Sequence, residues 1–347
     1  MLISRGPPLY VYVLSIAQQR EVRYATIGAM TEVKIHNDQS AWDELVMSTS
    51  GHPLQLWGWG EVKAAHGWKL DRVQVGQGGA QLLIKQLPKP FGPLVYVPRG
   101  PFGSLLTSDT GRQSFVDYVR NTYKPTVLTV EPDTTTPITW KGWKKSNNRI
   151  LLARTAVMDI TKTDDELMAV MTKKTRQYIR KSAGEGIEVV RATTTKDINE
   201  CLAIYKQTAQ RAGFALHDDT YYHDIFIKLG ENSPVFMAKI KGRVVAFLWP
   251  VVTPEIAFEL YGGMNDEGQT LRANYHLKWT VIQQMKQQGV KRYDVNGLLN
   301  DGVTAFKKGF IPDETQMSGT FDYPLSPLYS LWSTVLPAAK KLLQKVR

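Results

Sequence analysis

The fold is decided by residues 235–261, which read VFMAKIKGRVVAFLWPVVTPEIAFELY. β-Branched and aromatic residues are concentrated in three runs of this stretch, and such residues favour strands. The runs are residues 235–240, 243–251 and 256–261. Lys241 and Gly242 separate the first two runs and suit the tight turn of a hairpin. The stretch therefore predicts three consecutive antiparallel strands.

A helix and a fourth strand follow this meander. Residues 275–288 have helical spacing that ends at Gly289, and residues 292–295 are again strand-like. The order of three strands, a helix and a strand resembles the acyltransferase fold best known from acetyl-CoA-dependent N-acetyltransferases (GNAT). The elements predicted ahead of the meander are a helix at 167–181, a strand at 187–192 and helices at 198–212 and 220–229.

The first half of the chain alternates in a similar way and reads as a degraded copy of this unit. Its predicted helices are residues 41–47, 54–65 and 115–123, and its predicted strands are residues 72–75, 81–86, 94–97 and 126–130. The predicted fold class is α/β (α+β), with two tandem GNAT-like acyltransferase domains built from mixed sheets flanked by helices. Periodicity without the resemblance supports only two α/β domains.

Composition limits the function classes. The chain has 347 residues, 43% of them hydrophobic, which is enough for two packed cores. A formal net charge of +11 favours a polyanionic partner, such as nucleic acid, a phosphorylated substrate or an anionic membrane face. A basic protein without such a partner is the alternative. The single cysteine, Cys201, excludes an internal disulfide and a cysteine-rich zinc site, and the six histidines have no metal-ligand spacing.

The N-terminal residues do not continue the pattern. No apolar run approaches the ~20 residues that a membrane-spanning helix needs. Residues 9–17 are apolar, but tyrosines and a serine interrupt them and no small-residue cleavage site follows. We predict that residues 1–29 are an extension outside the fold; a secretory leader is the alternative.

A basic helix is predicted at residues 167–181. Lys173, Arg176 and Arg180 recur at i, i+3 and i+7 and share one face, to which Lys174 adds a further charge. Five cations within nine residues suit a surface that contacts phosphates. A solvated helix face is the alternative.

A second cationic segment is DGVTAFKKGF, residues 301–310, which follows a strand that ends in Asn296-Gly297. Phe306 is expected to pack inward and to hold Lys307 on a rigid scaffold beside a loop. A cation so placed can meet a developing oxyanion or a phosphate. A surface lysine in a hairpin is the alternative.

These two segments and three further strings together resemble the Fem family of peptidoglycan-bridge aminoacyltransferases. The further strings are QLWGWGEVK at 55–63, YVPRGP at 96–101 and VEPD at 130–133. The resemblance covers about residues 31–325. Enzymes of this family move an amino acid from aminoacyl-tRNA to the stem peptide of a cell-wall precursor, on two tandem domains of the fold described above.

The resemblance implies a substrate-binding set. Lys63 would bind the phosphates of the precursor, and Arg99 would help to position the substrate. Tyr221 and Tyr261 match tyrosines on the nucleotide part of the precursor. His217 falls where the family pattern carries an arginine, and imidazole is neutral near pH 7. This departure puts a nucleotide-linked precursor in doubt, whereas a lipid-linked precursor tolerates a weaker clamp.

The resemblance also implies a set of catalytic residues. Lys307 would be the cation nearest the tetrahedral oxyanion, with Phe306 beside it in the substrate site. Glu131 matches an acidic residue at a strand end, where it would orient or deprotonate the attacking amine; capping a neighbouring helix is the alternative. The basic helix would contact either the acceptor stem of tRNA or the phosphates of the precursor, through Lys173, Lys174, Arg176 and Arg180.

The function implied is transfer of an amino acid from aminoacyl-tRNA to the stem-peptide amine of lipid II or UDP-MurNAc-pentapeptide, which builds the interpeptide bridge. An ester is already activated, so neither a cofactor nor a metal is expected. We expect a monomer in the cytoplasm. The alternatives are an acyl-CoA-dependent N-acyltransferase and a non-catalytic basic RNA-binding protein. Residues 264–269 read MNDEGQ, with one glycine and two acids, a poor cradle for the pyrophosphate of acyl-CoA.

The expected domains are residues 30–155 and 156–325, and the resemblance implies that residues 326–347 pack back on the first domain. Residues 328–347 also combine apolar residues at helical spacing with a basic side, as interfacial helices do. Peripheral contact with the anionic inner face of the plasma membrane is therefore a second expectation for this segment.

Overall fold

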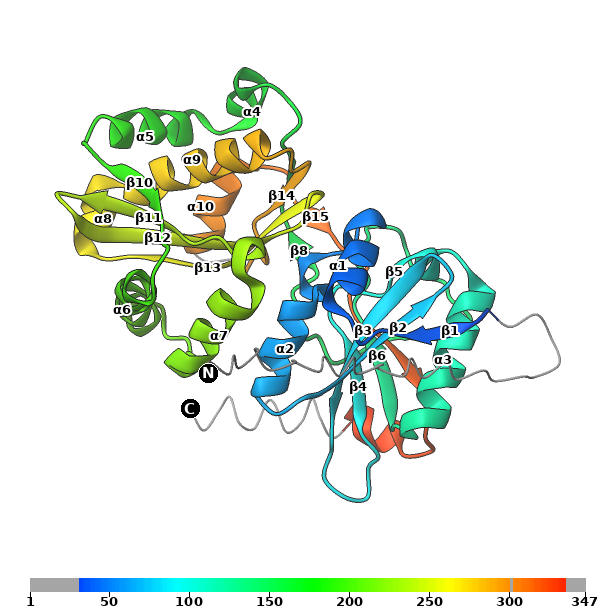
Figure 1. Ribbon diagram of the computed structural model, residues 1–347. Coiled ribbons are helices and arrows are strands. Elements are labelled where there is room, and N and C mark those ends of the chain that lie inside the picture. The colour runs from blue at the N-terminus through cyan, green and yellow to red at the C-terminus, as the bar shows by residue number, and fades with distance from the viewer. Residues whose placement is uncertain (1–30, 300–301, 335–347) are drawn as a thin grey trace, which may run out of the picture.

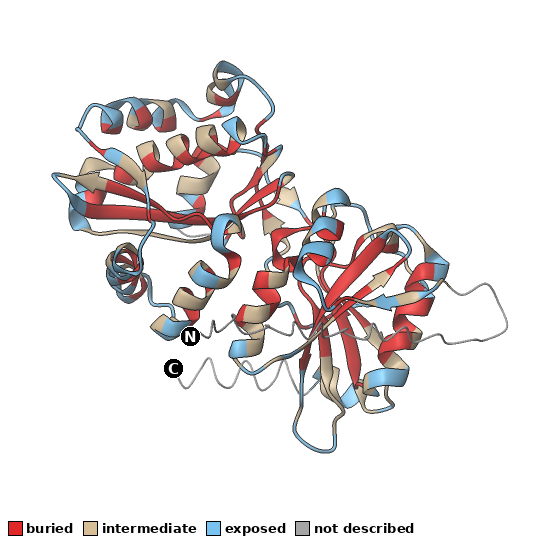
Figure 2. Ribbon diagram, viewed as in Figure 1, coloured by how far each residue is buried: buried red, intermediate tan, exposed pale blue. Residues whose placement is uncertain are grey.

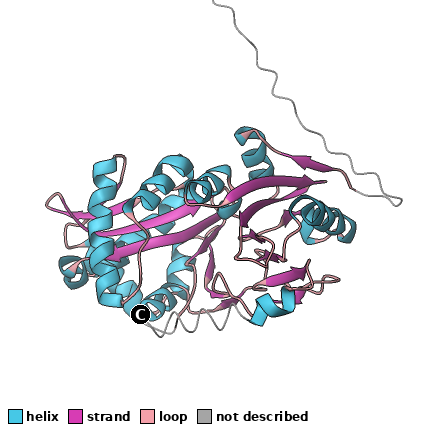
Figure 3. Ribbon diagram, turned by 90° about the horizontal axis from the view of Figure 1, so that it is seen from below, coloured by secondary structure: helices cyan, strands magenta, loops and turns pink. Residues whose placement is uncertain are grey.

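The structure is a computed structural model and describes residues 31–299 and 302–334. Two mixed sheets and the helices that pack against them make up most of these residues (Figures 1 and 3). The predicted extension, residues 1–29, lies outside the described residues, as does the end of the chain from residue 335 onward.

The first sheet has the order β1-β2-β3-β4-β6-β16-β7, with β5 paired to β3. Its strands are β1 (Val33–Ile35), β2 (Lys69–Val75), β3 (Gly78–Lys85), β4 (Leu94–Val97), β5 (Phe102–Gly103), β6 (Val127–Val130), β7 (Lys144–Lys145) and β16 (Phe321–Pro324). The pair β4–β6 is parallel, so the chain must cross the sheet between them, and α3 (Asp109–Tyr123) lies in that connection. The other helices of this half are α1 (Gln39–Ser48) and α2 (Trp57–Ala65).

The second sheet has the order β10-β11-β12-β13-β14-β9. Its strands are β9 (Val157–Asp159), β10 (Glu188–Arg191), β11 (Phe236–Ile240), β12 (Arg243–Val252), β13 (Ile256–Met264) and β14 (Arg292–Asp294). Its helices are α4 (Asp164–Val170), α5 (Lys173–Ala183), α6 (Thr195–Ala212), α7 (Asp219–Leu229), α8 (Asp266–Leu271), α9 (Ala273–Gln287) and α10 (Gly302–Phe310). In Figure 1, α5, α9 and α10 cover one face of this sheet, and α6 and α7 lie on the other. A small sheet of β8 (Arg154–Thr155) and β15 (Thr315–Gln316) joins the halves.

The two sheets repeat one arrangement. In each, an antiparallel meander is followed by a helical crossover and a parallel strand, which are β2-β3-β4, α3 and β6 in the first half and β11-β12-β13, α9 and β14 in the second. In each, an antiparallel strand from a distant part of the chain then closes the order, β16 in the first and β9 in the second. The predicted fold class is therefore confirmed.

Two predictions about the second half were wrong. Residues 321–324 were assigned to the second domain, but β16 pairs with β6 of the first sheet, with Phe321 opposite Val130. Strand pairing between distant segments leaves no local signal. The helix predicted at 167–181 is two helices, α4 and α5, because Met171 is extended and the Thr172 hydroxyl accepts a hydrogen bond from Thr175 N (3.3 Å) and so caps a new helix.

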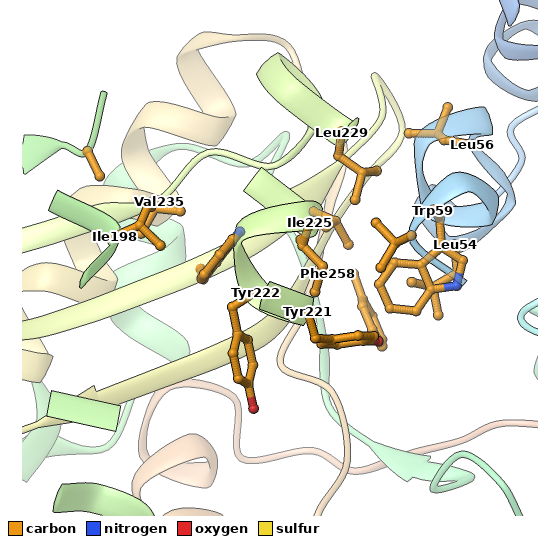
Figure 4. Close-up of a cluster of buried hydrophobic side chains, with 14 of the residues drawn as sticks. Leu54, Leu56, Trp59, Ile198, Tyr221, Tyr222, Ile225, Leu229, Val235 and Phe258 are labelled. Carbon is orange, nitrogen blue, oxygen red and sulfur yellow. The ribbon is translucent and has the colours of Figure 1, made fainter. Parts of the chain in front are cut away.

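The two halves pack around a common apolar core. Figure 2 shows that the strands of both sheets are largely buried. One cluster joins Trp59 of α2 to Ile225 and Leu229 of α7 (Figure 4). At Gly58 the two helices approach so closely that a Cβ atom would lie 2.2 Å from the carbonyl oxygen of Lys228. Glycine is therefore needed at residue 58, and the contact brings α2 side chains of the first half beside α7.

The described part of the C-terminal segment contacts the first half. The Trp332 ring lies 5.5 Å from that of Phe91, and the Tyr329 hydroxyl donates to Asp322 of β16 over 3.2 Å. The rest of the predicted interfacial helix, residues 335–347, lies outside the described residues. Among the helices that the structure describes, none has the length and apolar content to cross a membrane.

Candidate active site

Lys63 lies where the two halves meet. It occupies the last turn of α2, and its Nζ donates to the Tyr221 hydroxyl of α7 over 2.6 Å. The same ammonium lies 4.5 Å from the Trp59 ring centroid and 4.9 Å from that of Tyr221. Burial lowers the pKa of Lys63 to about 8. The site thus holds a half-buried cation among aromatic rings, which an anionic group would stabilise.

The structure brings His217, Tyr221 and Tyr261 together with Lys63. The His217 ring stacks on Tyr221 at 4.0 Å, just ahead of α7. Tyr261 of β13 lies 5.2 Å from the ring of Tyr222, the neighbour of Tyr221. Burial, and after it the charge of Lys63, lower the pKa of His217. This histidine therefore adds no permanent charge, and Lys63 supplies the cation.

Two residues of this cluster were missed from the sequence. His66 Nε2 lies 2.9 Å from Asp224 Oδ2, and its ring lies 4.9 Å from that of Tyr221. Each stands three residues after a predicted site residue, His66 after Lys63 and Asp224 after Tyr221. That helical spacing was the available signal. The pair connects α2 and α7 beside the cation.

Lys307 lies in α10, so the alternative of a lysine in a hairpin is wrong. Its Nζ donates to the carbonyl oxygens of Asn296 (2.5 Å) and Gly297 (2.9 Å), just after β14. Both residues have positive φ, 51° and 64°, and this left-handed turn aims the two carbonyls at the ammonium. Asp294 fixes the turn, because its Oδ1 accepts from Asn296 N over 2.8 Å.

Phe306 and Phe310 support Lys307 from one side of α10. Phe310 is fully buried, and Phe306 is half-buried with its ring 5.3 Å from that of Phe310. Lys278 of α9 lies 4.8 Å from the Phe306 ring centroid and forms a buried ion pair with Glu259 at 2.8 Å. The helix that carries Lys307 is thus held by an aromatic pair and by a buried charge pair beneath it.

Arg99 lies in a buried ionic cluster between the two halves. Its Nη1 is 3.8 Å from Asp133 Oδ1, and Asp133 also pairs with Arg292 of β14. Arg99 has a positive φ of 48° and lies 5.3 Å from the Phe258 ring centroid. Burial raises the pKa of the nearby Asp294, against the attraction of Arg99. Arg99 therefore lies buried near Asp294, the carboxylate that fixes the Lys307 turn.

Glu131 is buried and accepts four hydrogen bonds. Oε2 accepts from the Tyr96 hydroxyl, and Oε1 accepts from Leu151 N (2.9 Å), from Ile150 N and from Thr320 Oγ1 (2.6 Å). These donors come from β4 and from two loops. The carboxylate therefore ties distant parts of the first half together, and this geometry favours a structural part over proton transfer.

The four cations predicted on the basic helix differ in their surroundings. Lys173, Lys174 and Arg180 are exposed along α5. Arg176 is half-buried and its Nη1 donates to the carbonyl of Met171 (2.6 Å) and to two carbonyls of α4. It therefore caps the end of α4, whereas the other three cations remain exposed. Within residues 31–299 and 302–334, no cluster of histidine, cysteine or carboxylate side chains could hold a metal ion.

Comparison with known proteins finds a matching family model, curated relatives and solved structures with a similar fold. The model of the FemAB family matches residues 134–244 and 241–336. One relative, a lipid II:glycine glycyltransferase of Staphylococcus aureus (strain MRSA252), is 23% identical over 414 residues, which cover 90% of this chain and 98% of the relative. The crystal structure of FemX superposes with a TM-score of 0.78 at 21% identity and covers 87% of this chain and all of its own. L-PGS from Bacillus licheniformis gives a TM-score of 0.56 at 12% identity and covers 89% and 97%.

Proposed function

We propose that this chain, which belongs to the FemAB family and is an aminoacyltransferase, transfers an amino acid from aminoacyl-tRNA to an amine of a peptidoglycan precursor. Lipid II is the proposed acceptor, because the curated relatives are named for acting on it. The transferred residue would build the interpeptide bridge. The reaction would take place in the cytoplasm, at the inner face of the membrane that carries the lipid-linked acceptor.

The observation that carries the proposal is the cluster around Lys63. Residues 63 and 221 are 158 positions apart, yet they meet in a hydrogen bond across the two halves. A pyrophosphate is the anion that we assign to this site: the half-buried ammonium lies near the Trp59 and Tyr221 rings, and the His217 ring stacks on Tyr221. Because His217 stands in place of a permanent cation, Lys63 is the main electrostatic contact. This suits an acceptor whose lipid is already held at a membrane.

The chemistry requires alignment and charge stabilisation. The acceptor amine forms a bond to the ester carbonyl carbon of aminoacyl-tRNA, and the bond from that carbon to the ribose oxygen breaks. The proton that the amine loses goes to the leaving ribose oxygen, directly or through solvent. We assign to Lys307 and its turn the stabilisation of the tetrahedral oxyanion. Glu131 and Arg99 would build the scaffold behind this site and would not exchange protons with substrate.

An acyl-CoA donor is disfavoured by the segment between β13 and α9. In the acetyl-CoA enzymes a pyrophosphate loop is expected there, and here the segment forms α8. Asn265 caps α8 by accepting from Gly268 N over 2.8 Å, and Asp266 and Glu267 stand in its first turn. The acids repel phosphate, and the cap occupies an amide that would otherwise bind it.

Transfer assays test the proposal. Purified protein is incubated with a pool of charged tRNA and a short-chain lipid II analogue, and the mass of the product identifies the added residue. A mass increase of one or more aminoacyl groups is expected with charged tRNA, and none with deacylated tRNA or with acetyl-CoA. If acetyl-CoA is the donor that reacts, the function is wrong. If neither donor reacts while RNA binds, the non-catalytic alternative replaces it.

A further inference from the structure

Three aromatic residues in contact come from α5, α9 and α10, the helices that cover one face of the second sheet in Figure 1. The rings of Tyr178 (α5) and Tyr275 (α9) lie 5.0 Å apart, and those of Tyr275 and Phe306 (α10) lie 4.9 Å apart. All three residues are half-buried, and Tyr275 and Phe306 also pack against the core of the second half. We call Tyr178, Tyr275 and Phe306 the aromatic row. It ends at Phe306, the residue next to Lys307.

Cations surround the outer end of the aromatic row. The Arg272 guanidinium lies 4.4 Å from the Tyr178 ring centroid, and Lys174 Nζ lies 5.6 Å from it. Arg272 joins α8 to α9 in a left-handed conformation, with φ of 55°. A residue other than glycine adopts this conformation uncommonly, so the surroundings fix the backbone at Arg272. Lys173 and Arg180 of α5 are exposed and add positive charge.

The aromatic row is rigid because its helices are in close contact. Gly309 of α10 faces Thr175 of α5 so closely that a Cβ atom would lie 2.4 Å from Thr175 Oγ1. The Gly309 carbonyl accepts from Thr172 N over 3.0 Å at the start of α5. The basic helix is therefore tied directly to the helix that carries Lys307. A ligand that lay along the row would run from the cations of α5 to the proposed reaction centre.

We propose that the aromatic row and Arg272 bind the unpaired 3′-terminal nucleotides of aminoacyl-tRNA, whose bases stack on Tyr178 and the guanidinium while α5 contacts the adjoining phosphates. This inference rests on the proposed function and adds the site of the donor. Aromatic rings and guanidinium planes bind unstacked bases without regard to sequence, and each stacked base strengthens binding by roughly 5- to 150-fold. The ester at the 3′ end would then lie near Lys307.

Two other uses of the same surface make different demands. A pyrophosphate or an anionic lipid headgroup requires the cations but not the rings. Structural packing requires the rings but no ligand. Only single-stranded nucleic acid requires a ring and a cation together, with an unpaired end. The row is therefore tested by varying the ring and the RNA end separately.

The experiment measures the affinity of two RNA hairpins for the full chain by fluorescence anisotropy. One hairpin carries four unpaired 3′ nucleotides and the other is blunt. Tyr178→Ala is expected to weaken the overhang hairpin about tenfold and the blunt hairpin less than about twofold, by the stacking contribution of a single ring. Tyr178→Phe keeps the ring and should bind like the wild type. Arg272→Asn keeps a residue that tolerates positive φ but lacks the guanidinium, and it should weaken the overhang hairpin more than the blunt one.

Lys181→Ala is the control for charge alone, because Lys181 is exposed in the last turn of α5 and lies outside the aromatic row. It should weaken both hairpins equally. The proposal would be overturned if Tyr178→Ala and Arg272→Asn each lowered the affinity for both hairpins equally. It would also be overturned if either variant bound the overhang hairpin with unchanged affinity. Loss of binding to anionic vesicles, with both hairpins unaffected, would assign the surface to lipid instead. The anisotropy assay measures binding and does not depend on catalysis. A failed transfer assay would therefore refute the proposed function, whereas the hairpin affinities would still decide whether this surface binds RNA.

Discussion

Binding of the precursor should depend on pH through Lys63. Burial lowers the pKa of this ammonium to about 8 in the free protein, and a bound pyrophosphate would raise it again. The affinity is then fully present below pH 8 and falls as the pH rises above it. At about pH 9 only about a tenth of the free protein carries the charge, so the apparent dissociation constant should be about tenfold larger than at pH 7.

His217, Tyr221 and Tyr222 titrate outside this range. The pKa of His217 is lowered from its ordinary value by burial, so this ring is neutral throughout. Burial raises the pKa of Tyr221 to about 12 and that of Tyr222 above its ordinary value. A change in affinity between about pH 7 and pH 9.5 is therefore assigned to Lys63.

The assay is calorimetric titration with a soluble, pyrophosphate-containing precursor analogue across this range. Lys63→Met should bind about 10- to 100-fold more weakly at pH 7, the usual size of a lost charge-assisted hydrogen bond, and without the pH slope. Lys63→Arg keeps the charge at every pH and should remove only the slope. A wild-type affinity that stays constant to pH 9.5, or a slope that persists in Lys63→Met, would refute the reasoning.

Three further predictions concern Lys307, Glu131 and Lys278. Lys307→Met should lower kcat by about 10²–10³-fold with precursor affinity unchanged. Lys308→Met loses only an exposed pair with Glu314 and should stay near the wild-type rate. Equal rates in both variants would remove Lys307 from the mechanism. Glu131→Gln should lower the free energy of unfolding by about 2 kcal/mol and change kcat less than about threefold. A large loss of kcat at an unchanged melting temperature would instead indicate that Glu131 acts as a base. Lys278→Met should lower the free energy of unfolding in urea by about 3–5 kcal/mol, because it leaves the Glu259 carboxylate buried without its ion-pair partner. Adding Glu259→Gln to this variant should recover part of that loss. Equal stability of the single and the double variant would contradict this account.

The sequence determined the local units of this protein. The strands of the meander, the helix that ends near Gly289 and the strand after it all lie within a few residues of their predicted bounds. These elements depend on side-chain shape, on periodicity and on turn residues, which act between neighbours along the chain. The same local reasoning missed the Thr172 cap between α4 and α5, because a threonine inside an apparently helical run is a weak signal.

Resemblance to a family identified Lys63, Tyr221 and Lys307 as site residues, but it did not state their surroundings. That the Lys63 ammonium is half-buried, with a pKa of about 8, follows only from the packing of α2 against α7. That two left-handed residues hold Lys307 was likewise decided by the turn after β14, although the Asn296-Gly297 pair was visible in the sequence.

Tertiary structure alone decided which distant segments pair and what the charged residues do. Glu131 and Arg176 have the same sequence signature as catalytic or phosphate-binding residues, yet one accepts four hydrogen bonds and the other caps α4. β16 pairs with the first sheet although it follows the whole second half in the chain. Strand pairing, burial and ion pairing are set by groups far apart in the chain, so their energies depend on contacts that no local pattern of residues contains.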